Sequence, residues 1–130
     1  MGRRPDQKAR KGGRLRSLKV SPSFKSFVLD QLEELGDVTA RSMFGGVGLY
    51  HRGVFFGIVA RDTVYFKVGE TNRADYQRAK MKAFRPYPDR SGVMKYHAVP
   101  LEVLESPPDL ATWARKAIAV AASSPPSRRG

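Results

Sequence analysis

The sequence contains no cysteine, only two histidines and no long apolar run among its 130 residues. Without cysteine the chain can form no disulfide, no thiolate nucleophile and no zinc site of the cysteine type. No apolar segment approaches the roughly 20 residues that span a bilayer, and the basic N-terminus lacks the apolar stretch of a secretory signal. We therefore expect a cytoplasmic protein of one domain, since a chain of this length can bury a core without covalent cross-links.

Positive charge is abundant but unevenly distributed. The net charge is +12, yet residues 1–20 hold eight cations against one anion, and residues 21–122 carry a net charge of only +3. Low apolar content predicts disordered tails at residues 1–20 and 123–130. Three interpretations of the first tail stay open: an arm that attracts phosphate, a solvated arm without a target, or a segment upstream of a native start near Val20.

The body, residues 21–122, predicts an α+β fold that begins with a helix. Ser21 is a suitable N-cap, apolar residues recur at helical spacing up to Leu35, and Gly36 is placed to end the helix. Carboxylates cluster in and just beyond its second half, which predicts a solvated face rather than a metal or acid–base site. They are Asp30, Glu33, Glu34 and Asp37.

Four β-prone segments follow, at residues 38–43, 47–51, 54–60 and 63–68. Short turns join them, which favours an antiparallel four-stranded meander because parallel pairing needs a long crossover. In the last segment Val64, Phe66 and Val68 share one face and should contact the core. Gly57 interrupts the third segment and predicts either a bulge or a close approach of the first helix.

The remainder predicts a short helix, two further strands and a C-terminal helix. Thr71 should cap the short helix, which runs to about Ala79. A proline-containing edge strand at 84–87 and a strand at 93–99 follow. The final helix opens near Pro107 and carries an apolar stripe.

The run Arg41-Ser-Met-Phe-Gly-Gly-Val-Gly-Leu-Tyr50 is the most distinctive stretch of the chain. It predicts a hairpin turn at Gly45-Gly46, because glycine adopts positive φ without steric cost. A phosphate-binding loop is not favoured, since no helix N-terminus follows and the Walker lysine and Rossmann spacing are missing. The structural residues of this motif are Met43, Phe44, Gly45, Gly46 and Gly48.

Taken together, several segments resemble the N-terminal domain of the TfoX/Sxy family, which is associated with regulators of natural competence. These segments are residues 41–50, 64–68, 71–73, 84–87, 94–96 and 110–113. The resemblance covers essentially the whole body and implies a fold similar to that of type III secretion chaperones. The family's full-length regulators also carry a C-terminal helical domain, so we expect this chain to represent the N-terminal domain alone.

The resemblance further implies a role in transcription of DNA-uptake genes through a protein such as the cyclic-AMP receptor protein. No helix-turn-helix signature is visible, which fits a co-regulator better than a factor that reads bases. The secretion-chaperone likeness also suggests dimerisation, and the edge of a meander makes a homodimer physically reasonable.

Residues 73–90 form a candidate nucleic-acid-binding segment. The segment interleaves cations with Tyr76, Phe84 and Tyr87, a composition that can hold single-stranded nucleic acid through phosphate pairing and base stacking. Its cations are Arg73, Arg78, Lys80, Lys82, Arg85 and Arg90. The alternative, which we favour, places the aromatic side chains in the core and the cations on a solvated rim.

No catalytic, metal or cofactor site can be assembled from these residues. A zinc site would need both His51 and His97 together with carboxylates. Ser42, His51 and Asp62 lack the nucleophile elbow of a hydrolase. We therefore predict a non-enzymatic regulatory module that acts through protein contacts, without a membrane partner. The alternative is a nonspecific nucleic-acid-binding protein that uses the basic tail and residues 73–90.

Overall fold

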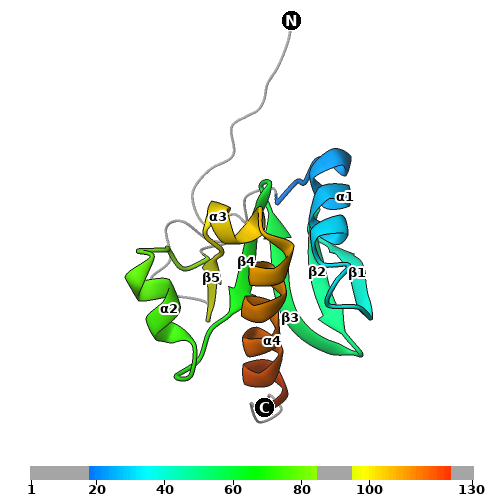
Figure 1. Cartoon of the computed structure of the whole chain (residues 1–130). Coiled ribbons are helices and arrows are strands. Elements are labelled where there is room, and N and C mark those ends of the chain that lie inside the picture. The colour runs from blue at the N-terminus through cyan, green and yellow to red at the C-terminus, as the bar shows by residue number, and fades with distance from the viewer. Residues whose placement is uncertain (1–17, 85–94, 124–130) are drawn as a thin grey trace, which may run out of the picture.

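The computed structural model describes residues 18–84 and 95–123 (Figure 1). In chain order the elements are α1 (Pro22–Gln31), β1 (Val38–Met43), β2 (Gly46–His51), β3 (Val54–Ala60), β4 (Thr63–Lys67), α2 (Arg73–Arg78), β5 (Tyr96–Ala98), α3 (Leu101–Leu104) and α4 (Pro107–Ser123). The strands form one antiparallel sheet in the order β1-β2-β3-β4-β5. The predicted α+β class and the meander are confirmed. The predictions for residues 1–17 and 124–130 lie outside the described residues.

The main core lies between the sheet and two helices on the same side of it, α1 and α4 (Figure 1). Val28 from α1 and Leu110 from α4 are each at most 1% exposed and belong to one apolar cluster with the strands. Val64, Phe66 and Val68 belong to this cluster, as their alternation predicted. None of the helices within residues 18–84 and 95–123 is long and apolar enough to cross a membrane.

Helix α1 starts as predicted and ends earlier. The Ser21 hydroxyl oxygen accepts a hydrogen bond from the Phe24 N–H at 3.2 Å, which caps the helix. The helix ends at Gln31, and a turn follows it. Gly36 adopts the expected left-handed conformation with φ 78°, and Asp37 follows with φ 58°. The glycine therefore reverses the chain after the turn instead of capping the helix.

The folded body begins three residues before the predicted boundary. Leu18 is 2% exposed and packs against Ile58 and Ala60 on the side of the sheet opposite α1 and α4. Its N–H donates to the carbonyl of Phe44 at 3.4 Å, and its carbonyl accepts from the N–H of Arg61 at 3.2 Å. The prediction of disorder up to residue 20 is therefore wrong for residues 18–20, because one buried leucine anchors them.

The hairpin between β1 and β2 turns one residue earlier than predicted. Phe44 and Gly45 are its two turn residues, with φ of 53° and 87°, both in the left-handed region. Gly46 is already the first residue of β2 and pairs with Met43. A Cβ on Gly46 would lie 2.7 Å from the carbonyl oxygen of Val59. The second glycine therefore serves close strand packing, and the first serves the turn.

A bulge interrupts the pairing of β2 with β3 beside Gly57. Leu49 pairs with Gly57 but Tyr50 pairs with Phe55, so Phe56 is the extra residue. A Cβ on Gly57 would come within 3.1 to 3.2 Å of atoms on β2 and β4. The predicted bulge is thus present. The close neighbours of Gly57 are adjacent strands, and the suggested approach of the first helix is wrong.

The second half departs from the prediction in several places. Asn72, not Thr71, occupies the N-cap of α2. Strand β5 is shorter than predicted, and Ala83 alone forms an isolated bridge with it, to His97. The remaining residues of the predicted edge strand, 85–87, lie outside the described residues. Helix α3 was not predicted, because a single turn of Leu-Glu-Val-Leu carries too little periodicity to distinguish it from a loop.

Candidate functional site on the second face of the sheet

The side of the sheet opposite α1 and α4 carries aromatic and cationic side chains, and we call it the second face. Strand side chains alternate between the two sides, so paired residues share one side. One such row runs across all five strands through Arg41, Gly48, Ile58, Tyr65 and Ala98. A small apolar cluster around Ile58 covers part of this face, and it includes Leu18 and Phe84.

Three aromatic rings and two cations make a continuous line of contacts across the second face. Tyr50 stacks on Phe55 with centroids 5.0 Å apart, and Phe55 contacts Tyr96 at 5.5 Å. The Arg41 guanidinium lies 5.3 Å from the Tyr50 ring, and the Lys67 ammonium lies 5.2 Å from the Tyr96 ring. We call these five residues the aromatic row. Each of its two ends is a cation–π pair.

Gly48 provides the space in which two of these rings lie. A Cβ at this position would be 3.2 Å from the rings of both Tyr50 and Phe55, and 3.2 Å from the sulfur of Met43. The rings therefore lie across the glycine and cover the bare backbone of β2. The third glycine of the distinctive run thus has a definite role, which is to let aromatic side chains lie along the sheet.

The electrostatics of the second face are positive. Apart from two histidines, the strands of the described structure carry two ionisable basic side chains, Arg41 and Lys67. None of these five strands carries a carboxylate. Partial burial lowers the pKa of Lys67, and the nearby Lys95 charge lowers it further. Burial also raises the pKa of Tyr96 to about 12, so this phenol stays neutral.

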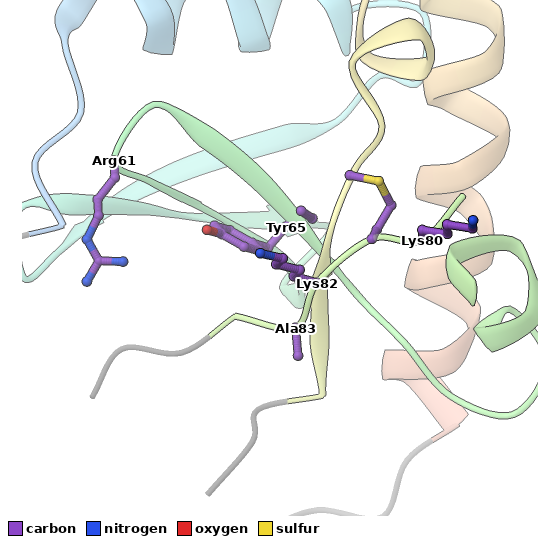
Figure 2. A pocket seen from close by; sticks show the side chains of 7 residues that line it. Arg61, Tyr65, Lys80, Lys82 and Ala83 are labelled. Carbon is purple, nitrogen blue, oxygen red and sulfur yellow. The ribbon is translucent and has the colours of Figure 1, made fainter. Parts of the chain in front are cut away.

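A basic cleft of about 420 Å³ opens where Tyr65 meets the segment after α2 (Figure 2). Tyr65, two residues from Lys67 on the same side of β4, forms its wall and contacts Phe84 at 4.8 Å. Figure 2 shows Lys82 beside the Tyr65 ring and Arg61 on the side toward which the Tyr65 hydroxyl is directed. Lys80 also lines the cleft, but its ammonium points away from Tyr65. The cleft therefore extends the positive face toward the start of β4.

The structure describes four of the six cations predicted from residues 73–90. Lys80 and Lys82 line the basic cleft, whereas Arg73 and Arg78 lie on α2. Arg78 is 2.6 Å from the Asp75 carboxylate, which also accepts from Lys116 at 2.9 Å. Arg85 and Arg90 lie outside the described residues. Nucleic-acid binding at these six residues therefore stays a prediction.

The two aromatic residues of this segment that the structure describes, Tyr76 and Phe84, belong to the core. Tyr76 is 1% exposed and meets Trp113 of α4 edge to face at 4.7 Å, and Phe84 is 2% exposed. Tyr87 lies outside the described residues. Tyr76 and Phe84 thus agree with the favoured alternative of core aromatics, and neither offers an open stacking surface.

Both histidines lie on strands and away from any group of potential metal ligands. Within residues 18–84 and 95–123, no three histidine, aspartate or glutamate side chains come close enough to hold a metal ion. His97 lies 5.8 Å from the Tyr76 ring, and burial together with the Arg73 charge lowers its pKa. The Tyr76 hydroxyl and His97 Nδ1 are buried without a hydrogen-bond partner among the described residues.

An apolar groove of about 260 Å³ lies where α1 and α3 approach the rim of the sheet. Phe24, Met81, Val99 and Leu101 are among its lining residues. Leu101 is 63% exposed, which is unusual for a leucine. The Gln31 side-chain amide donates to the carbonyl of Leu104 at 2.9 Å and so ties the two helices together.

A comparison with known families finds a match to the TfoX N-terminal domain over residues 30–121. This chain belongs to the TfoX N-terminal domain family. The predicted resemblance is confirmed. The match covers the five strands and most of α4, and therefore both the aromatic row and the basic cleft. No curated protein matches the chain.

Sequence reasoning missed the aromatic row of this TfoX N-terminal domain, although part of its signal was visible. The alternation that assigns Val64 and Phe66 to the core also implies that Tyr65 and Lys67 lie on the other side of β4. Tyr50, Phe55 and Tyr96 come from three other strands. Only the strand register, including the bulge at Phe56, brings their rings into contact. A residue count along one strand cannot provide that register.

Proposed function

We propose that this chain is a non-enzymatic regulatory module that acts in transcription by binding a protein partner in the cytoplasm. The observation that carries this proposal is the apolar groove between α1 and α3. Membership of the TfoX N-terminal domain family is consistent with a binding module. The three residues weighed above for a hydrolase site lie apart or have other partners in the structure. Ser42 and His51 lie near opposite ends of the β1–β2 pair, and the Asp62 carboxylate accepts hydrogen bonds from Ser21.

The chemistry of the groove favours a basic amphipathic helix as the occupant. Apolar side chains line it, and Phe27 beside Phe24 is 37% exposed in addition to Leu101. Asp62 lines the groove, and further carboxylates lie on α1, on α3 and in the segments that follow these helices: Asp30, Glu33, Glu34, Glu102 and Glu105. The apolar stripe of the partner helix would fill the groove, as in other helix-in-groove complexes. Lysines or arginines on either side of that stripe would pair with these carboxylates.

A site-specific crosslinking experiment tests the proposal in living cells. A photoreactive phenylalanine analogue at Leu101 would lie at the groove, and the same analogue at Phe44, which is 72% exposed in the β1–β2 turn, is the matched control. We expect Leu101 to capture one protein of the transcription apparatus and Phe44 to capture none. Equal capture at both positions, or capture of unrelated proteins at Leu101, would contradict the proposal.

A further inference from the structure

We propose that the second face of the sheet binds single-stranded nucleic acid. Bases would stack on the half-buried rings of Tyr50, Phe55 and Tyr65, since Tyr96 is only 6% exposed. Phosphates would contact Arg41 and Lys67 at the ends of the row and Arg61 and Lys82 at the basic cleft. This site goes beyond the proposed function, because it takes another class of partner on a surface that meets the apolar groove only at Met81 and Ala98.

Three rings of this face are fixed in place and partly open. Tyr50 and Phe55 stack on each other with centroids 5.0 Å apart, the Arg41 guanidinium lies over the Tyr50 ring, and Tyr65 lines the basic cleft. Tyr50, Phe55 and Tyr65 are half-buried, which fixes their orientation while leaving surface for a ligand. Fixed aromatic surfaces on a sheet accept unpaired bases of any identity, because every base has a flat face.

The cations on this face are available for phosphate. Within the described residues, the carboxylate ion pairs involve Arg52, Arg78 and Lys116, and none involves Arg41 or Lys67. A guanidinium held over a ring keeps its N–H groups free to donate to an anion. Lys67 and Lys95 also repel each other, and a bound phosphate between them would relieve that repulsion.

The combination of rings and cations distinguishes nucleic acid from other anionic partners. An acidic peptide would satisfy the cations but would leave three half-buried rings without a matching group. A duplex would present phosphates while keeping its base faces stacked inside the helix. Unpaired nucleotides alone satisfy both parts of the face, since they offer a flat base and a phosphate in each repeat.

Fluorescence anisotropy with the full chain and a labelled twelve-nucleotide oligo-dT tests this proposal. Tyr50→Leu keeps apolar bulk and removes a stacking ring, and we expect it to weaken binding about tenfold. Arg41→Gln should reduce the slope of log affinity against log salt by about 0.7, because it removes one cation that pairs with phosphate. Arg115→Gln is the matched control, because Arg115 is exposed on α4 on the other side of the sheet and should change neither quantity beyond a weak general charge effect.

Three outcomes would overturn the proposal. If Tyr50→Leu and Arg41→Gln both bind oligo-dT as tightly as the wild type, other cations of the chain are responsible for binding. Equal or tighter binding of a twelve-base-pair duplex would remove the role of the rings. Competition by oligoglutamate as strong as that by unlabelled oligo-dT would identify the face as a general anion or peptide site. Circular dichroism of each variant ensures that a loss of binding is compared between folded proteins.

Discussion

Replacement of Asn72 by alanine should destabilise the protein strongly, although the residue precedes only a short helix. Asn72 is 1% exposed and is the buried polar residue of the described core. Its side-chain oxygen accepts from the Gly69 N–H at 2.8 Å, and its amide donates to the Lys67 carbonyl at 3.0 Å. The side chain thus holds the chain in the turn that leads from β4 into α2.

The magnitude follows from the two backbone groups that the substitution leaves unpaired. Each such group costs about 1–3 kcal/mol, and the lower end applies because Gly69 and Lys67 are half-buried and water can reach them. We therefore expect Asn72→Ala to lower the free energy of unfolding by about 2–3 kcal/mol. For a domain of about this size that corresponds to a fall in melting temperature of at least about 8 °C.

Urea unfolding followed by tryptophan fluorescence measures this loss. Trp113 is the only tryptophan of the chain and contacts Tyr76 of α2, so its emission reports on the element that Asn72 positions. The matched control is Thr71→Ala. Thr71 is the cap that the sequence predicted, but it is exposed and lies outside the N-cap position. Its substitution should cost under about 0.5 kcal/mol. An equal loss in the two variants, or no loss in Asn72→Ala, would refute this reasoning.

Three further substitutions test other parts of the structure. Leu18→Ala should lower the free energy of unfolding by about 2–5 kcal/mol in thermal or urea melts, since Leu18 is buried, whereas a disordered residue would show no effect. Tyr76→Phe should leave the free energy of unfolding unchanged or raise it by up to about 1 kcal/mol, because it removes a buried hydroxyl without a partner in the described residues. A clear fall of this free energy in urea unfolding would show that the hydroxyl is hydrogen-bonded. His97→Gln should flatten the pH dependence of stability. The folded-state pKa of His97 lies below its unfolded value of 6.5. Its contribution to stability is therefore full above that pH and is lost as the pH falls through the folded-state pKa. An equal change of melting temperature between pH 7.5 and 5 in the wild type and in His97→Gln would contradict this prediction.

The helix-side half of the fold was predictable from sequence because its signals are local. Alternation in β4 identified its core residues, and Ser21 capped α1 as its side-chain chemistry requires. The hairpin at the distinctive run was also correct apart from its register. That error arose because Gly45 and Gly46 look alike in sequence, while only Gly46 faces the carbonyl of Val59 on another strand.

The second face was not predictable to the same extent because its contacts are long-range. Leu18 looked like part of a basic tail, since its neighbours in sequence are polar and its partners, Ile58 and Ala60, are forty residues away. The cap of α2 was misplaced by one residue for a related reason. Thr71 and Asn72 are both good cap residues, and only the approach of the Lys67 carbonyl decides between them.

The two proposed binding surfaces meet at one rim of the sheet, and this arrangement gives the domain a physical way to join its partners. Met81 and Ala98 line both the basic cleft and the apolar groove. A protein helix in the groove and a nucleic-acid strand on the second face would therefore contact neighbouring parts of the same segment after α2. The charges differ between the two surfaces, since Asp62 lines the groove while Arg41 and Lys67 lie on the strands of the second face. Such a module would need no helix-turn-helix, because the two proposed surfaces would hold a protein partner beside single strands without reading base sequence.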